Sequence, residues 1–165
     1  MKLFSTKNIY TVLLFFIAVS FLLYAKNKGM TGATLKNGEG CDCHGDQSKS
    51  VMVKIEGPES MKTGSTADFK VIIEGGPSVN GGVNIAVSSG ILIAGKGLKL
   101  SKKELTHIEP QKSVDGKLAF DFKFTAPSNV SEITIYAAGN SGNGNDSKKG
   151  DMWNFAPNKK VLIEG

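Results

Sequence analysis

The stretch Leu118-Ala119-Phe120-Asp121-Phe122-Lys123-Phe124 is the clearest indication of the fold. Its phenylalanines occupy every second position and alternate with two charged residues, which is the period of a strand with one buried and one solvated face. The same alternation recurs on both sides of this stretch, at 51–55, 69–73, 83–87, 133–137 and 161–163. The pattern predicts an all-β fold.

Turn-forming sequences separate these runs. They are Glu56-Gly57-Pro58, Gly75-Gly76-Pro77, Asn80-Gly81-Gly82, Asp115-Gly116 and Ala126-Pro127. A further apolar run, 91–100, is interrupted by two glycines. Short strands at regular spacing are typical of a sandwich, so we expect an antiparallel immunoglobulin-like β-sandwich of seven to eight strands over residues 51–165. Residues 26–50 are expected to form a linker, polar and glycine-rich over 26–40, and a segment with both cysteines that leads into the sandwich.

The composition limits the class of protein. A chain of 165 residues suits one domain with an appendage, and its 40% hydrophobic content is enough for a core. The net charge of +5 comes from lysines alone, because the chain has no arginine. Proteins that bind nucleic acids favour arginine for reading bases, and these lysines are dispersed among acids. We therefore expect no nucleic-acid partner.

The N-terminus resembles an export signal. Lys2 and Lys7 precede an apolar run over residues 9–25, and two more lysines follow it. We expect a hydrophobic helix that is either a signal peptide (residues 1–25) or an uncleaved signal anchor, since the run is near the lower limit for a membrane span. Both versions place the rest of the chain outside the cytoplasm, in the periplasm or at the cell surface, and the anchor would make the membrane a partner.

The run Gly40-Cys41-Asp42-Cys43-His44-Gly45 contains both cysteines and one of the two histidines. A c-type haem is attached through C-x-x-C-H, where two thiols bind the porphyrin and the histidine ligates iron. Here a single residue, Asp42, separates the cysteines. We predict covalent haem attachment through Cys41 and Cys43, or through Cys43 alone if the backbone at Asp42 does not bend. His44 would be the proximal ligand.

Two other uses of the cysteines remain open. A disulfide is usual in an exported protein, but a ring with one intervening residue is strained and closes almost no loop. Zinc or copper(I) could instead be held by the two thiolates with His44 and His107, although zinc sites normally have wider spacing between cysteines. An iron–sulfur cluster needs more thiolates than the chain has.

His107 is the only other histidine and lies in an apolar, strand-like segment. A histidine in such a place is by default a hydrogen-bonded structural residue. Electron-transfer haems, however, take two strong axial ligands, which makes His107 the predicted distal ligand. The alternative sulfur ligands are Met52, Met61 and Met152.

Several short motifs together resemble a known family. They are Thr31-Gly32-Ala33, the cysteine–histidine run, Leu105-Thr106-His107, Phe122 to Pro127, Tyr136 to Asn140 and Gly150-Asp151, in this order. The chain from about residue 29 to 163 is similar to the reeler-like "choice-of-anchor V" domains of exported bacterial proteins. The resemblance implies an immunoglobulin-like sandwich after a haem-attachment motif, with Cys41, Cys43 and His44 in that motif and His107 as a distal ligand. The short spacer at Asp42 departs from the family pattern.

The loop 139–151 (GNSGNGNDSKKGD) is rich in asparagine, aspartate and glycine. Its oxygens would suit calcium, but their order does not match a calcium-binding loop and two lysines oppose a dication. We expect a solvated loop. The apolar Met152-Trp153-Asn154-Phe155 that follows would either pack on a cofactor or close the sandwich.

These observations predict an exported monohaem c-type cytochrome that transfers electrons in the cell envelope. An iron with two histidine ligands has no open position for a substrate, so we expect no enzyme activity. The predicted partners are redox proteins, and stacking of copies into a homo-oligomer is an extension of this prediction. The alternative is a non-redox extracellular binding or structural module with a Cys/His metal site.

Overall fold

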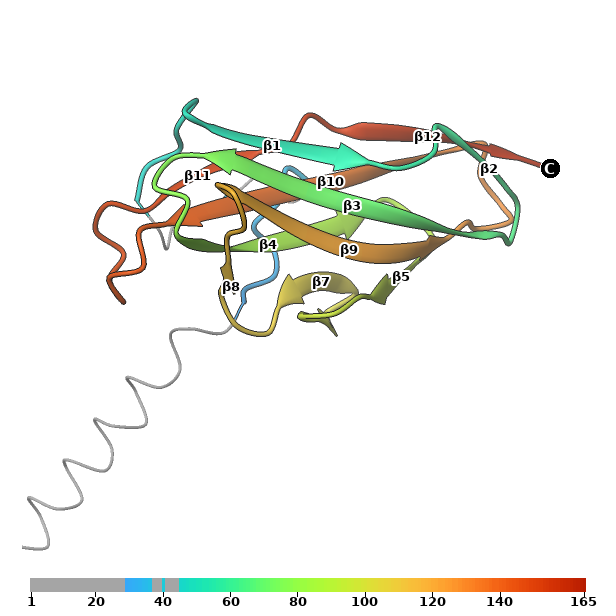
Figure 1. The fold of residues 1–165 in the computed structure, drawn as a ribbon. Coiled ribbons are helices and arrows are strands. Elements are labelled where there is room, and N and C mark those ends of the chain that lie inside the picture. Colours follow the sequence, from blue (N-terminus) through green and yellow to red (C-terminus); the bar gives the residue numbers. More distant parts are fainter. Residues whose placement is uncertain (1–28, 37–39, 41–44) are drawn as a thin grey trace, which may run out of the picture.

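The computed structural model of the chain describes residues 29–36, 40 and 45–165. The elements of this part are all strands, arranged in two packed sheets (Figure 1). They are β1 (Val51–Glu56), β2 (Ser60–Lys62), β3 (Thr66–Gly75), β4 (Asn80–Val87), β5 (Ile91–Ala94), β6 (Leu98–Ser101), β7 (Glu104–His107), β8 (Gln111–Lys112), β9 (Lys117–Thr125), β10 (Glu132–Gly142), β11 (Met152–Phe155) and β12 (Lys159–Glu164). The predicted helix before residue 26, and with it the signal or anchor, lies outside the described residues.

The smaller sheet has four strands in the order β1-β3-β9-β5. The larger has eight: β2-β12-β10-β4-β7-β6 form its main path, β11 pairs with β10, and β8 pairs with β4. Every pairing is antiparallel except that of β12 with β2. The predicted all-β, antiparallel sandwich is confirmed. In the part of the chain that is described, no helix is long and apolar enough to span a membrane.

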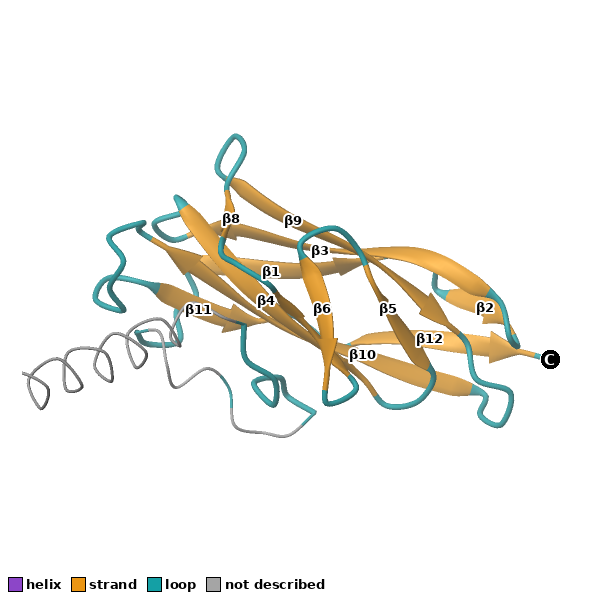
Figure 2. Ribbon diagram, turned by 90° about the horizontal axis from the view of Figure 1, so that it is seen from below, coloured by secondary structure: helices purple, strands orange, loops and turns teal. Residues whose placement is uncertain are grey.

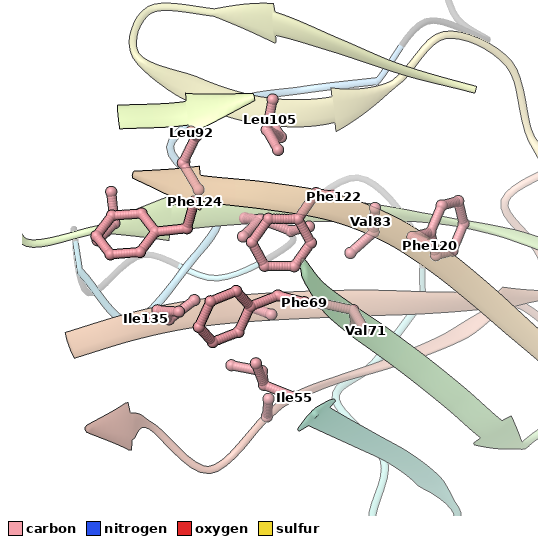
Figure 3. Packing of buried hydrophobic residues seen from close by; sticks show 14 of the residues in the cluster. Ile55, Phe69, Val71, Val83, Leu92, Leu105, Phe120, Phe122, Phe124 and Ile135 are labelled. Carbon is pink, nitrogen blue, oxygen red and sulfur yellow. The ribbon is translucent and has the colours of Figure 1, made fainter. Parts of the chain in front are cut away.

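The core lies between the two sheets and is centred on the phenylalanine run 118–124. That run is β9, and its rings point inward while Asp121 and Lys123 point to solvent. In Figure 3 the ring of Phe122 lies beside that of Phe69 from β3, with centroids 5.6 Å apart, and Phe124 meets Phe69 edge-on at 6.1 Å. Offset and edge-on rings of this kind add to the stabilisation that burial provides.

Oppositely charged side chains cover the outer face of the smaller sheet. Ion pairs join β3 to β9 at Lys70–Asp121 (3.3 Å), Glu74–Lys117 (2.8 Å) and Asp68–Lys123 (3.2 Å). The hydrogen bond from Lys117 to Glu74 raises the pKa of that lysine. Such exposed pairs contribute little to stability, and their opposite signs are compatible with the observed pairing of β3 with β9.

The turn between β6 and β7 has an unusual composition. Ser101 pairs with Glu104, which leaves Lys102 and Lys103 as a two-residue loop, and both have positive φ (49° and 66°). Such loops favour Asn-Gly or Asp-Gly, because side chains with a Cβ are strained at positive φ. The favoured pair does occur elsewhere in this chain, as Asp115-Gly116 in the turn before β9, with φ of 50° and 75°.

Replacing Lys102 with asparagine and Lys103 with glycine is expected to raise the free energy of unfolding by about 1–2 kcal/mol. The reason is relief of the backbone strain, and the change is measured by chemical denaturation. The reverse exchange, Asp115→Lys with Gly116→Lys, is the matched control and should lower stability by a similar amount. Equal stability of all three proteins would contradict the assignment of strain to this turn.

Candidate functional site

Residues 29–36, which we call the lead-in segment, pack on the outer face of the larger sheet, the face turned away from the core. In Figure 1 this blue segment lies behind β4 and β10. Gly29 N–H donates to the His107 carbonyl (3.2 Å) at the end of β7. Ala33 is buried and Thr34 has no exposed surface. This part of the predicted linker is therefore held against the sandwich.

Two buried polar side chains hold the lead-in segment. The Glu104 carboxylate accepts the Gly32 N–H at 2.7 Å, and Asn84 Oδ1 accepts the Ala33 N–H at 2.9 Å. Asn84 Nδ2 in turn donates to Glu104 at 2.9 Å and to the Leu105 carbonyl at 3.1 Å. Asn84 thus ties β4, β7 and the lead-in segment together, and its polar groups are satisfied as burial requires.

His107 lies half-buried beside Gly82 at the end of β7. The Val83 N–H is 3.1 Å from His107 Nδ1, and the Val83 carbonyl is 3.3 Å from the same nitrogen. When Nδ1 accepts the N–H, a neutral ring carries its proton on Nε2. When Nδ1 instead donates to the Val83 carbonyl, the lone pair is on Nε2, so the Val83 backbone orients the ring in either tautomer.

Gly82 makes the position of the His107 ring possible. A Cβ there would collide with ring atoms Cε1 and Nδ1 and lie 2.6 Å from Nε2. We expect Gly82→Ala to displace the ring and to cost about 1–2 kcal/mol of stability through the lost Val83 hydrogen bond and the clash. A double-mutant cycle with His107→Ala, measured by chemical denaturation, tests this expectation. Gly82→Ala should lower the free energy of unfolding much less when the His107 ring is absent. Equal costs in both backgrounds would contradict it.

An aromatic pair on β11 holds the chain on either side of the cysteine–histidine run. The rings of Trp153 and Phe155 meet edge-on, with centroids 5.1 Å apart. A Cβ at Gly40 would lie 2.6 Å from the Trp153 ring and 3.1 Å from that of Phe155. At the other end of the run, Trp153 Nε1 donates to the Gly45 carbonyl at 3.2 Å. The observed contacts of Trp153 are with the two ends of the cysteine–histidine run, a role that was not among the two predicted for this apolar segment.

One buried oxygen lies in the same region without a partner. Asn140 is on β10, in register with Gly82 of β4 on one side and Trp153 of β11 on the other. Its Oδ1 is buried and has no hydrogen bond within the described structure. On the outer face of the larger sheet, the His107 imidazole, the Asn140 amide oxygen and the Trp153 indole therefore lie on β7, β10 and β11.

The prediction of haem, iron and metal binding is wrong for the part of the chain that is described. Residues 29–36, 40 and 45–165 contain no group of three or more histidine, cysteine, aspartate or glutamate side chains that could hold a metal ion. His107 is bonded to the Val83 backbone, and Met61 is buried in the core while Met52 is 61% exposed on β1. Met152 accepts a hydrogen bond from Ser50 at 3.2 Å. Cys41, Cys43 and His44 lie outside the described residues.

The asparagine-rich loop after β10 is closed by its own side chains. Asn143 Nδ2 and Asn145 Nδ2 both donate to the Lys149 carbonyl (2.9 and 3.2 Å), and Asp151 accepts the Asn143 N–H at 3.0 Å. Asn143 Oδ1 and Asn145 Oδ1 accept backbone N–H groups two residues ahead. These oxygens form turns within the loop.

No family model matches the chain, and no curated protein matches it. Among solved structures it is similar to the CARDB domain of the PF1109 protein from Pyrococcus furiosus, solved in complex with di-metal ions (18% identity, 68% of this chain and 91% of that one, TM-score 0.40). It is also similar to the PKD domain of an M14-like peptidase from a Thermoplasmatales archaeon (11% identity, 69% and 94%, TM-score 0.42). The resemblance to "choice-of-anchor V" domains stays a prediction.

Asn84 and Glu104 were not singled out by the sequence analysis. Polar residues at alternate strand positions are usually solvated, so nothing in their own segments indicates that a distant part of the chain covers them. The composition of β4 is the one indication that a segment covers this face. Its outer side carries Asn84 and the small residues Gly82 and Ala86, which leave room for another part of the chain to pack there.

Proposed function

We propose that the chain is an exported, non-catalytic structural module of the cell envelope, which fixes its own N-terminal segment to a β-sandwich. The supporting observation is that two backbone N–H groups of the lead-in segment, at Gly32 and Ala33, donate to the buried side chains of Glu104 and Asn84. Any attachment made by the N-terminus would thereby be joined to the folded domain without a free linker between them.

The buried acceptors make this contact stronger than a surface association. Hydrogen bonds to charged groups contribute about 1.5–3 kcal/mol, and leaving either acceptor unpaired in a buried site carries a penalty of similar size. Thr34, which has no exposed surface, adds packing to the polar contacts. Release of the lead-in segment is therefore expected to be rare in the folded protein.

Hydrogen exchange of the full chain tests the proposal. The amides of Gly32 and Ala33 should exchange as slowly as those in β7, and Asn84→Leu should accelerate them by tenfold or more. Asn145→Ala, in the exposed loop, is the control and should leave them unchanged. Fast exchange of both amides in the unaltered chain would overturn the proposal.

A spectrum separates this function from electron transfer. A non-redox module made together with a c-type maturation system should give no pyridine haemochrome α-band after extraction with acidified acetone. A covalently retained haem would contradict the proposal. Electron transfer through Cys41, Cys43 and His44 involves residues outside the described part and stays a prediction.

A further inference from the structure

The β5–β6–β7 edge, which we define as residues 91–108, concentrates positive charge at one side of the sandwich. Its sequence contains four lysines and one acid, Glu104, whose carboxylate is buried beneath the lead-in segment. Figure 2 shows β5 and β6 beside each other where the edges of the two sheets meet. The ion pairs of the described residues lie outside this edge, so none of them neutralises Lys96, Lys99, Lys102 or Lys103.

Backbone strain at the tip of this edge is the second observation. Lys102 and Lys103 occupy positions of positive φ, where asparagine and glycine would be unstrained. Strain of this kind persists where another role requires the side chains. Two adjacent ammonium groups on the outermost turn of an edge hairpin are well placed to meet an anionic surface.

Exposed apolar side chains accompany the lysines. Leu100 on β6 is 55% exposed, and Ile91 and Ile93 on the edge strand β5 are 62% and 41% exposed. Edge strands are commonly protected by charged side chains on the strand itself, yet β5 is Ile-Leu-Ile-Ala. Apolar groups flanked by lysines suit the boundary between lipid headgroups and acyl chains.

The path of the chain indicates which surface this edge faces. Gly29 is hydrogen-bonded to the end of β7, and Met30 and Ile108 beside that bond are also exposed. Only residues 26–28 separate Gly29 from the apolar run 9–25. Three residues span about 10 Å at most. A bilayer that holds the apolar run therefore lies within reach of this edge.

We propose that the β5–β6–β7 edge docks on a lipid surface that carries anionic headgroups. The lysines at the hairpin tip contact the headgroups, and Leu100 with the β5 isoleucines enters the interface. The lead-in segment fixes the edge toward the bilayer, so this inference rests on the proposed function. Its electrostatic part should weaken with salt, because exposed charges are screened over about 8–10 Å near physiological ionic strength.

Tryptophan fluorescence of the full chain in vesicles tests the contact. Leu100→Trp and Leu162→Trp are matched, since both leucines are 55% exposed and Leu162 is on β12, away from this edge. In phosphatidylcholine vesicles with 30% phosphatidylglycerol, brominated lipid should quench the emission added at position 100 at least twofold more than that added at 162. Each is measured relative to the unaltered chain, which carries only Trp153. Equal quenching of the two would overturn the proposal.

A pair of charge variants tests the lysines. Lys102→Gln with Lys103→Gln should remove most of the extra quenching at position 100, whereas Lys148→Gln with Lys149→Gln, an equal change of charge in the 139–151 loop, should leave it. Quenching that is the same in phosphatidylcholine alone, or that survives the loss of both hairpin lysines, would overturn recognition of anionic headgroups. So would binding of this edge to an acidic protein without any lipid quenching.

Exchange of the Gly32 and Ala33 amides, measured in the same vesicles, separates the two proposals. Slow exchange without quenching at position 100 would refute the membrane contact alone. Fast exchange would refute the structural module on which the contact depends, and the contact with it.

Discussion

Replacing Phe122 with alanine is expected to lower the free energy of unfolding by about 4 kcal/mol. The Phe122 ring is 2% exposed and stacks on Phe69 at 5.6 Å between the two sheets. Its removal eliminates buried apolar area and leaves a cavity that the rigid strands around it cannot close. Denaturation by urea, followed by far-ultraviolet circular dichroism, measures the change.

The control for this prediction is Met52→Ala on β1. Met52 is 61% exposed, so its truncation should change stability by less than about 0.5 kcal/mol. Phe122→Leu keeps most of the apolar volume and should fall between the two variants. If Phe122→Ala destabilised the protein no more than Met52→Ala, the ring would not belong to the core as the structure places it.

The second large effect is expected at Asn84. Asn84→Leu should cost about 3 kcal/mol, because it removes the partners of the Ala33 N–H, the Leu105 carbonyl and one contact of the buried Glu104 carboxylate. Leucine is close to asparagine in size, so lost hydrogen bonding accounts for most of the change. The same denaturation experiment measures it.

Glu104→Gln is the companion variant to Asn84→Leu. A glutamine keeps an oxygen for the Gly32 N–H and for Asn84 Nδ2 while it removes the charge, so a loss of about 1 kcal/mol is expected. If Asn84→Leu were as stable as the unaltered chain, the polar contacts to the lead-in segment would contribute nothing to folding.

The alternation of apolar residues predicted most of the sandwich. Runs that alternate over five or more residues, such as 118–124 and 69–73, became the long strands β9 and β3, because their period matches the pleat. The shorter β2, β8 and β11 were not predicted, since two to four residues cannot establish a period. The described structure consequently has more strands than the seven to eight expected.

The packing of the lead-in segment on the larger sheet could not be predicted from the sequence, for a different reason. Its glycines, threonines and alanine have no hydrophobic periodicity and are typical of a linker. The acceptors that hold it, Asn84 and Glu104, are 51 and 72 residues away along the chain. Only the folding of the sheet brings the three together.

For the residues on the outer face of the larger sheet, the sequence indicated which positions are unusual but did not indicate their contacts. His107 was chosen as a candidate ligand because histidines are scarce, and the structure places it against Gly82 with the Val83 backbone as its partner. The scarcity of a residue type indicates that a position is unusual, but it does not identify the atoms that surround it. Trp153 was expected to pack on a cofactor or to close the sandwich, and its contacts with the two ends of the cysteine–histidine run required the fold.

The attachment of the lead-in segment also determines an order of events during folding. The segment precedes its binding site by more than 70 residues, since Gly32 is bonded to Glu104. Contacts of such sequence separation form late, after local hairpins such as β6–β7 have closed. Residues 29–36 must therefore stay unbound until β7 has formed. Folding of the sandwich then ends, rather than begins, with the most N-terminal segment that the structure describes.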